Sequence, residues 1–164
     1  RGKQKLLLAG LATNLALIGT LYHAPGLLAA VNATGQAKLN PFIRATGWDD
    51  LGQQLRPHVQ THPDAVLIAN NRTLLAHMAY ELRDWRPDVA SWNPEGGAGD
   101  HFKLTTNLGA RRGADALLLT EEVPGQEFIQ RFKRVEKLAS LKTPLDTTTS
   151  RHFEVYLLHE FQGY

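Results

Sequence analysis

Hydrophobic residues fill the first part of the chain almost without interruption, and no charged side chain occurs between Lys5 and Lys38. Three basic residues open the chain: Arg1, Lys3 and Lys5. A helix needs about 20 mostly apolar residues to cross the hydrocarbon core of a bilayer, and Leu6–His23 nearly reaches that length. Because positive residues stay on the cytoplasmic side, the pattern predicts a membrane-spanning helix that breaks near Pro25, with the rest of the chain outside the cytoplasm.

Two other interpretations of this segment stay open. An uncleaved signal peptide also has a basic start, an apolar centre and small residues such as Ala29, Ala30 and Ala33. A buried helix of a soluble protein is the other alternative, since Gly10 and Asn14 make the stretch less hydrophobic than a typical anchor. The chain begins with Arg rather than Met, so we expect a piece of a longer membrane protein with this helix as its last span.

After a polar linker, the pattern changes to alternating helices and strands. Thr46 is the expected N-cap of an amphipathic helix that ends near Pro63. Residues 65–69 form a short, continuous apolar run, which is typical of a buried parallel strand. Asn70 or Asn71 can cap the next helix. Its expected buried stripe consists of Leu74, Leu75, Met78, Ala79 and Leu82.

The second half predicts further strands. Residues 89–92 and 114–120 read as strands, and residues 153–161 alternate as a closing strand with one packed face. Residues 127–141 carry Phe128, Phe132 and Val135 at helical spacing, although their second half is compatible with a strand. This order predicts an α/β fold, a three-layer sandwich with a mainly parallel sheet, preceded by the N-terminal hydrophobic helix.

The predicted organisation therefore has three parts. Residues 1–31 form a transmembrane or membrane-associated helix, residues 32–45 form a linker, and residues 46–164 form a soluble extracytoplasmic α/β domain. The chain has 164 residues and no cysteine, which excludes disulfides and cysteine nucleophiles. Its net charge of +2 is too small to indicate a nucleic-acid partner. No motif implies a cofactor.

The candidate binding site is a glycine-rich loop that follows the second strand. Its expected contact residues are Asn93, Gly96, Gly97, Gly99, Asp100 and His101. The loop lacks the spacing of a phosphate-binding motif, and no clear helix start follows it, so a flexible surface loop is the alternative. His58 and His62 are four residues apart, but Pro63 ends the helix there and we predict no metal site. No catalytic constellation is visible.

A basic stretch lies further along the chain. Its residues are Arg131, Lys133, Arg134, Lys137 and Lys142. Such a surface can contact anionic lipid headgroups beside a membrane, or it can be an ordinary solvated face.

Several motifs together resemble one family. The run Asn40-Pro41-x-x-Arg44-x-x-Gly47-Trp48-x-x-Leu51 is similar to the segment after the last membrane span of bacterial polyprenyl-phosphate-dependent glycosyltransferases, such as protein mannosyltransferases and the lipid A aminoarabinose transferase. Gly47 and Trp48 are its sharpest points. Three later motifs follow in the family's order: Asp100–Thr105, Gly113–Leu119 and Phe161–Gly163. Asn40 replaces the family's Asp, and Lys103 and Thr105 replace an Asp and a Trp.

The resemblance implies a function for the whole polypeptide. Such an enzyme moves a sugar from a polyprenyl phosphate donor to an extracytoplasmic acceptor, and its catalytic carboxylate lies before the segment present here. This chain would then be the last span and an accessory soluble domain of the bacterial inner membrane, with the domain in the periplasm. Its expected partners are membrane lipid, the preceding transmembrane domain, the sugar donor and the acceptor. The alternative is a membrane-tethered periplasmic binding module without transferase activity.

Overall fold

The computed structural model describes residues 2–30, 43–145 and 149–164. The chain divides into two compact units, which are described separately. One contains residues 1–46 and 145–149, and the other contains residues 47–144 and 150–164. The predicted linker at residues 32–45 lies mostly outside the described residues. Its last part forms a short 3-10 helix, η3 (Ile43–Ala45).

The first unit contains the predicted apolar helix. Helix α1 (Gly2–Ala30) has 29 residues, and its stretch Gly2–Ala24 is long and apolar enough to cross a membrane. The large side chains described there, such as Leu8 and Leu15, are exposed to the surroundings. The prediction that the helix breaks near Pro25 is wrong, because the helix continues through Pro25 to Ala30.

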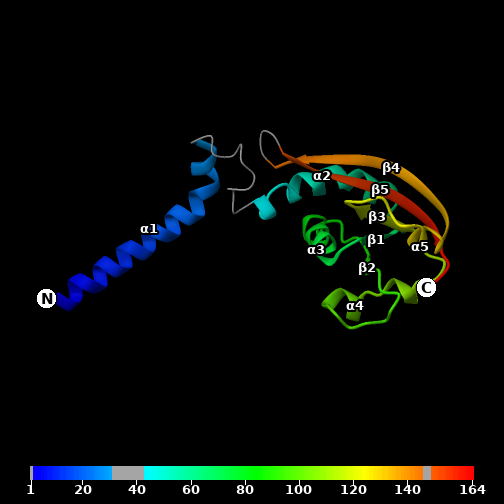
Figure 1. Cartoon of the computed structure of the whole chain (residues 1–164), viewed down its shortest axis with the longest axis horizontal. Coiled ribbons are helices and arrows are strands. Elements are labelled where there is room, and N and C mark those ends of the chain that lie inside the picture. Colours follow the sequence, from blue (N-terminus) through cyan, green and yellow to red (C-terminus); the bar gives the residue numbers. More distant parts are fainter. Residues whose placement is uncertain (1, 31–42, 146–148) are drawn as a thin grey trace. The chain divides into compact units, whose positions relative to one another are not determined.

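The second unit is an α/β domain around a sheet of five strands in the order β2-β1-β3-β5-β4 (Figure 1). Its strands are β1 (Val66–Ala69), β2 (Val89–Ser91), β3 (Ala116–Thr120), β4 (Phe132–Pro144) and β5 (Ser150–Phe161). Strand β1 pairs in parallel with β2 and β3, whereas β5 pairs antiparallel with β3 and β4. The sheet is therefore mixed, and the prediction of a mainly parallel sheet is wrong.

The helices of this unit are α2 (Trp48–Thr61), α3 (Arg72–Glu81), α4 (His101–Thr105) and α5 (Gln126–Ile129), with the 3-10 helix η4 (Leu108–Ala110). The helix α2 precedes the first strand of this unit, and the shorter helices connect successive strands. The predicted N-cap of α2 is wrong. Gly47 occupies that position with a left-handed backbone at φ 82°, and the Thr46 hydroxyl donates to the Ile43 carbonyl at 3.0 Å. Glycine adopts this conformation without the cost that a side chain would add.

Two apolar clusters cover the two faces of the sheet, because alternate strand residues point to opposite sides. Leu67 of β1 and Leu117 of β3 pack on one side against α2 and α3. Their neighbours Ile68 and Leu118 pack on the other side, together with Leu108, Phe132 and Phe161. This arrangement confirms the buried strand at residues 66–69. Because β1, β2 and β3 run in parallel, their three carboxyl ends lie at the same edge of the sheet.

The antiparallel half differs most from expectation. Residues 132–144, which carry two of the helically spaced apolar residues, form β4, and only Gln126–Ile129 is helical. An irregularity between Lys137 and Ala139 interrupts the alternation of β4, which hides the strand period in the sequence. Strand β5 is not at an edge, since it lies between β3 and β4. Glu160 has φ 51°, and Phe161 packs on the face opposite to Phe153.

Candidate functional site

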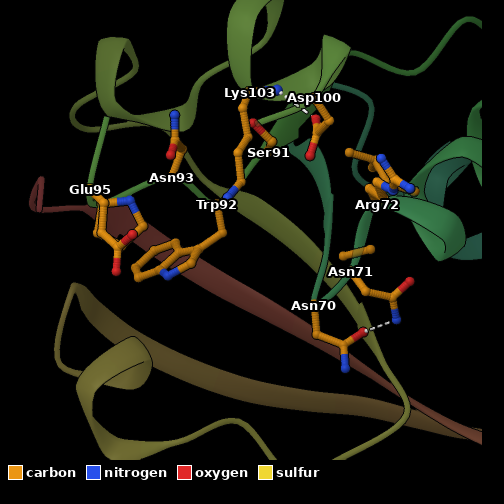
Figure 2. A pocket seen from close by; sticks show the side chains of 12 residues that line it. Asn70, Asn71, Arg72, Ser91, Trp92, Asn93, Glu95, Asp100 and Lys103 are labelled. Carbon is orange, nitrogen blue, oxygen red and sulfur yellow. Dashed lines mark hydrogen bonds between the residues drawn. The ribbon is translucent and has the colours of Figure 1, made fainter. Parts of the chain in front are cut away.

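A cavity of about 480 Å³ lies at the carboxyl ends of β1 and β2, where α3 begins (Figure 2). The chain passes from β1 through α3 to β2 and then returns across β1 to β3, so the strand order reverses at β1. Ligands of open α/β sheets bind at such a reversal, outside the carboxyl ends of the strands. The lining residues are Ala69, Asn70, Asn71, Arg72, Leu75, Ser91, Trp92, Asn93, Pro94, Glu95, Asp100 and Lys103.

The first wall comes from the turn between β1 and α3. Asn71 is the N-cap of α3, as one of the two predicted alternatives required, and its Oδ1 accepts a hydrogen bond from the Leu74 amide at 2.9 Å. Its Nδ2 donates to Asn70 Oδ1 at 3.1 Å. These bonds fix the two side chains in the wall and leave the first turn of α3 at the rim of the cavity.

The second wall comes from the end of β2. The Asn93 amide donates to Tyr164 Oη at 2.8 Å, and Asn93 Nδ2 donates to the Gly97 carbonyl at 2.9 Å. Asn93 is only 2% exposed and Ser91 8%, yet Asn93 Oδ1 and Ser91 Oγ have no hydrogen-bond partner among the residues that the structure describes. A buried polar atom without a partner costs about 1–3 kcal/mol, so such atoms are uncommon and need a reason.

Tyr164 anchors this second wall. Its hydroxyl donates to Asn107 Oδ1 at 3.1 Å while it accepts from the Asn93 amide. Burial raises the pKa of the Tyr164 phenol, while donated bonds from the amides of Asn93 and Gly109 oppose that rise. The phenol thus stays neutral and holds the end of β2 in place.

Four ionisable side chains line the cavity. Arg72 belongs to the first turn of α3, and Lys103 projects from α4. Glu95 lies in the loop after β2, and Asp100 caps α4 by accepting from the Lys103 amide at 3.0 Å. In the described part of the chain, none of the four forms an ion pair within 4.0 Å. Two cations and two carboxylates therefore face the cavity in equal number.

Trp92 separates this cavity from a smaller one of about 210 Å³ beside it. Its ring packs against Phe128 at 4.1 Å and edge-on to Tyr164 at 5.0 Å between ring centres. The smaller cavity also borders Asn70, Leu118 and other apolar residues near the end of β3. Trp92 is thus held by aromatic neighbours while it lines both spaces.

The predicted loop residues take different positions. Asn93 and Asp100 line the cavity, and Gly97 supplies the carbonyl that holds the Asn93 side chain. Gly96 has φ +66°, which favours glycine, and it does not line the cavity.

The other two predicted residues lie on the α4 side of the loop. Gly99 lies near the Lys103 side chain, because a Cβ added at Gly99 would lie 4.0 Å from Lys103 Cδ. His101 is exposed and faces a neighbouring groove between α3 and α4, which it shares with Arg72 and Asp100. The expectation that no helix starts after the loop is wrong, since Asp100 caps the five-residue helix α4.

Gly47 and Trp48 lie away from this cavity. The Trp48 ring stacks on the His77 ring, with 4.0 Å between centres and 7° between planes, and the Arg151 guanidinium lies 4.3 Å over the Trp48 ring. Burial lowers the pKa of His77, Arg151 lowers it further, and Glu81 opposes both. The predicted motif residues thus have a packing role at the start of α2.

Four of the five residues of the basic stretch lie in β4, and Arg131 directly precedes that strand. Acidic residues neutralise part of this charge. Lys133 pairs with Glu160 at 2.8 Å, and Lys137 pairs with Glu154 at 2.7 Å. The Glu154 bond raises the pKa of Lys137, and that same bond lowers the pKa of Glu154. This pairing of lysines with glutamates of β5 favours a solvated face of mixed charge over a surface that contacts anionic lipid.

His58 lies in the last turn of α2, and His62 is the C-cap of that helix. Within the described residues, no group of three or more His, Asp or Glu side chains has suitable geometry for a metal ion. Burial lowers the pKa of His58, and the neighbouring His62 lowers it further.

Sequence reasoning did not identify most of the wall. The missed residues are Asn70, Asn71, Arg72, Ser91, Trp92, Glu95 and Lys103. A usable signal was present, because Asn70 directly follows the apolar run at residues 65–69 that was predicted to be a buried parallel strand, and Trp92 ends the predicted strand at residues 89–92. The carboxyl ends of such strands are the expected ligand edge.

No protein-family model, no curated protein and no solved structure matches the chain.

Proposed function

We propose that the chain is the C-terminal region of a bacterial inner-membrane glycosyltransferase, and that its α/β domain is an accessory ligand-binding domain. The whole enzyme would move a sugar from a polyprenyl phosphate donor to an extracytoplasmic acceptor. The order of motifs from Asn40 to Gly163 supports the transferase part of the proposal. We also propose that this domain is a three-layer sandwich, in which helices cover both faces of the mixed sheet.

The cavity at the ends of β1 and β2 is the observation that carries the binding role. Its polar groups come from the α3 N-terminus, the end of β2 and α4, so three separate segments converge on one space. A concave site with a few convergent polar groups is the usual form of a small-molecule site. The residues that line it would bind and orient a ligand while the transfer itself takes place elsewhere in the polypeptide.

The proposed location follows from α1. Its basic residues precede the apolar stretch, so the α/β domain would lie in the periplasm. Membrane lipid and the preceding transmembrane domain would then surround α1, and the domain would meet the sugar donor and acceptor at the outer surface.

A second candidate is a membrane-tethered periplasmic binding module with no transferase attached. The specific observation in its favour is that this one chain holds both an apolar helix and a domain with its own cavity. The coding sequence upstream of Arg1 separates the candidates. A continuous frame with many apolar spans supports the transferase, whereas a start codon immediately before Arg1 supports the module.

The transferase proposal predicts that Lys103→Met impairs sugar transfer in the intact polypeptide. We expect at least a tenfold lower rate, because the substitution removes a cation from the cavity wall while it keeps the apolar stem. The measurement is incorporation of labelled sugar into the acceptor in membranes that contain equal amounts of each variant.

The matched control is Lys142→Met, an exposed lysine of β4 on another part of the domain. It should leave the transfer rate unchanged. If Lys103→Met also transfers at the parental rate, the cavity has no role in the reaction.

A further inference from the structure

The charges in the cavity are separated in space as well as balanced in number. In Figure 2, Arg72 lies on one side of the space, and Glu95 lies on the opposite side beside Trp92. Asp100 and Lys103 lie between these two ends. A ligand that spans the cavity therefore meets a positive end, a balanced middle and a negative end.

The positive end combines Arg72 with the start of α3. Asn71 Oδ1 satisfies the Leu74 amide, which leaves the earlier amides of the first turn at the rim. Amides at a helix N-terminus and an arginine both favour a negatively charged group such as a phosphate or carboxylate. Because α3 has ten residues, its aligned peptide dipoles reinforce that preference.

The negative end combines three groups that favour a cation or a strong donor. Glu95 supplies a carboxylate, and the Trp92 ring supplies a π face that can attract an ammonium group. Asn93 Oδ1 is a buried acceptor with no partner among the described residues. An N–H donor from a ligand would satisfy this oxygen.

The middle of the cavity adds no net preference for either charge. One carboxylate oxygen of Asp100 accepts a hydrogen bond from the Lys103 backbone amide. The negative charge of Asp100 offsets the positive charge of the neighbouring Lys103 side chain. A ligand with only an acidic group, or only an amine, would leave one end of the cavity without a complement. A charged group that loses water without a partner is unfavourable.

We propose that this cavity binds a small zwitterion, with its phosphate or carboxylate at Arg72 and the α3 N-terminus, and its ammonium at Glu95, Asn93 Oδ1 and the Trp92 face. The inference rests on the proposed function only in using the same cavity for ligand binding. Asn93 lines the cavity wall, and its Oδ1 is the buried, unpartnered acceptor among the described residues that the ligand ammonium would satisfy.

The test is a titration of the full chain in detergent micelles, followed by NMR of the tryptophan indole N–H groups. The Trp92 signal is identified by its loss in Trp92→Phe. Phosphoethanolamine and β-alanine are the zwitterionic probes, while inorganic phosphate and ethanolamine carry one charge each. We expect at least one zwitterion to shift the Trp92 signal and to bind at least tenfold more tightly than phosphate or ethanolamine.

Variants identify the two ends. Arg72→Gln and Glu95→Gln should each weaken zwitterion binding at least tenfold. Arg83→Gln and Asp84→Asn serve as matched controls because both residues are exposed after α3 and outside the cavity wall. They should leave the affinity unchanged.

Micelles doped with phosphatidylethanolamine distinguish the source of the zwitterion. A shift with a soluble probe supports a free ligand, and a shift only with the lipid supports a headgroup. Equal binding of phosphate alone, or no shift with any zwitterion, overturns the inference. Sugar transfer by Lys103→Met is a separate measurement, so impaired transfer without zwitterion binding would retain the proposed function and reject this ligand class.

Discussion

At the level of single residues, neighbouring charges and rings decide what each group does. Trp48 packs between His77 and the Arg151 guanidinium, and this packing holds the start of α2 on the domain. The sequence pattern pointed to Trp48 as a motif residue, but it predicted Thr46 as the N-cap of α2. Glycine and threonine are both acceptable N-caps, so only the backbone angle of Gly47 decides between them.

His77 predicts a pH dependence of stability. Its pKa in the folded chain is below the ordinary value of 6.5, so the unfolded chain binds a proton first as the pH falls. Stability is therefore complete above about pH 6.5 and decreases as the pH falls toward the folded pKa. In His77→Phe, which keeps the stacked ring, urea midpoints should fall less between pH 7 and pH 5 than in the parent.

The control for this measurement is His101→Phe, because His101 is exposed on α4. It should leave the slope of the urea midpoint against pH as it is in the parent. An identical slope for the parent and for His77→Phe would contradict the role assigned to His77.

At the level of elements, the sequence predicted the parallel strands and the closing strand at residues 153–161, which is part of β5, but it left β4 of the antiparallel hairpin ambiguous. Residues 66–69 form an uninterrupted apolar run that is buried on both faces, and this is a direct sequence signature. The irregularity in β4 and the positive φ of Glu160 disturb the period of two in β4 and β5. Such local changes of twist depend on cross-strand contacts that no single segment encodes.

The candidate site was readable only in part for a related reason. Asn93 and Asp100 lie in one glycine-rich loop, which attracts attention in the sequence. Arg72 and Lys103 come from separate helices and reach the same space through the crossover of the chain. Strand order brings these segments together, and strand order was not predicted.

The contact between α2 and α3 predicts a strong effect at Gly52. A Cβ added there would lie 2.7 Å from the Glu81 Cβ, so Gly52→Ala must push the helices apart. Overpacking costs typically about 1–3 kcal/mol, whereas the better helix propensity of alanine returns only about 1 kcal/mol. We expect a net loss of about 1 kcal/mol, and at most about 2 kcal/mol, in the free energy of unfolding, measured by urea denaturation.

Gly97→Ala is the matched control, since a Cβ at that loop position would meet nothing within 4 Å. Its free energy of unfolding should stay close to that of the parent. A Gly52→Ala variant as stable as Gly97→Ala would show that the two helices can separate without loss.

At the level of the whole molecule, the apolar helix and the α/β domain are separate compact units. Each has a distinct physical character, since α1 exposes its large apolar side chains and the domain buries its own. This contrast is what a lipid environment for one unit and water for the other would require.

The proposed orientation can be tested with introduced cysteines, because the chain has none of its own. In intact cells, a membrane-impermeant maleimide should label Gln60→Cys on α2 and leave Gln4→Cys near the basic start unlabelled. Lysis should make both labelled. Labelling of Gln4→Cys alone in intact cells would place the domain in the cytoplasm.

Strand β4 borders the sheet along 13 residues and has one side without a strand partner among the described residues. Proteins held at a membrane surface collide more often than proteins free in solution. An unpaired edge strand can then pair with the edge strand of a second molecule. Here the border carries Lys133, Arg134, Lys137 and Lys142 against the single acid Glu136, and an irregularity between Lys137 and Ala139 interrupts its register. Two such borders would bring like charges together, so crowded copies should resist fusing into a shared sheet.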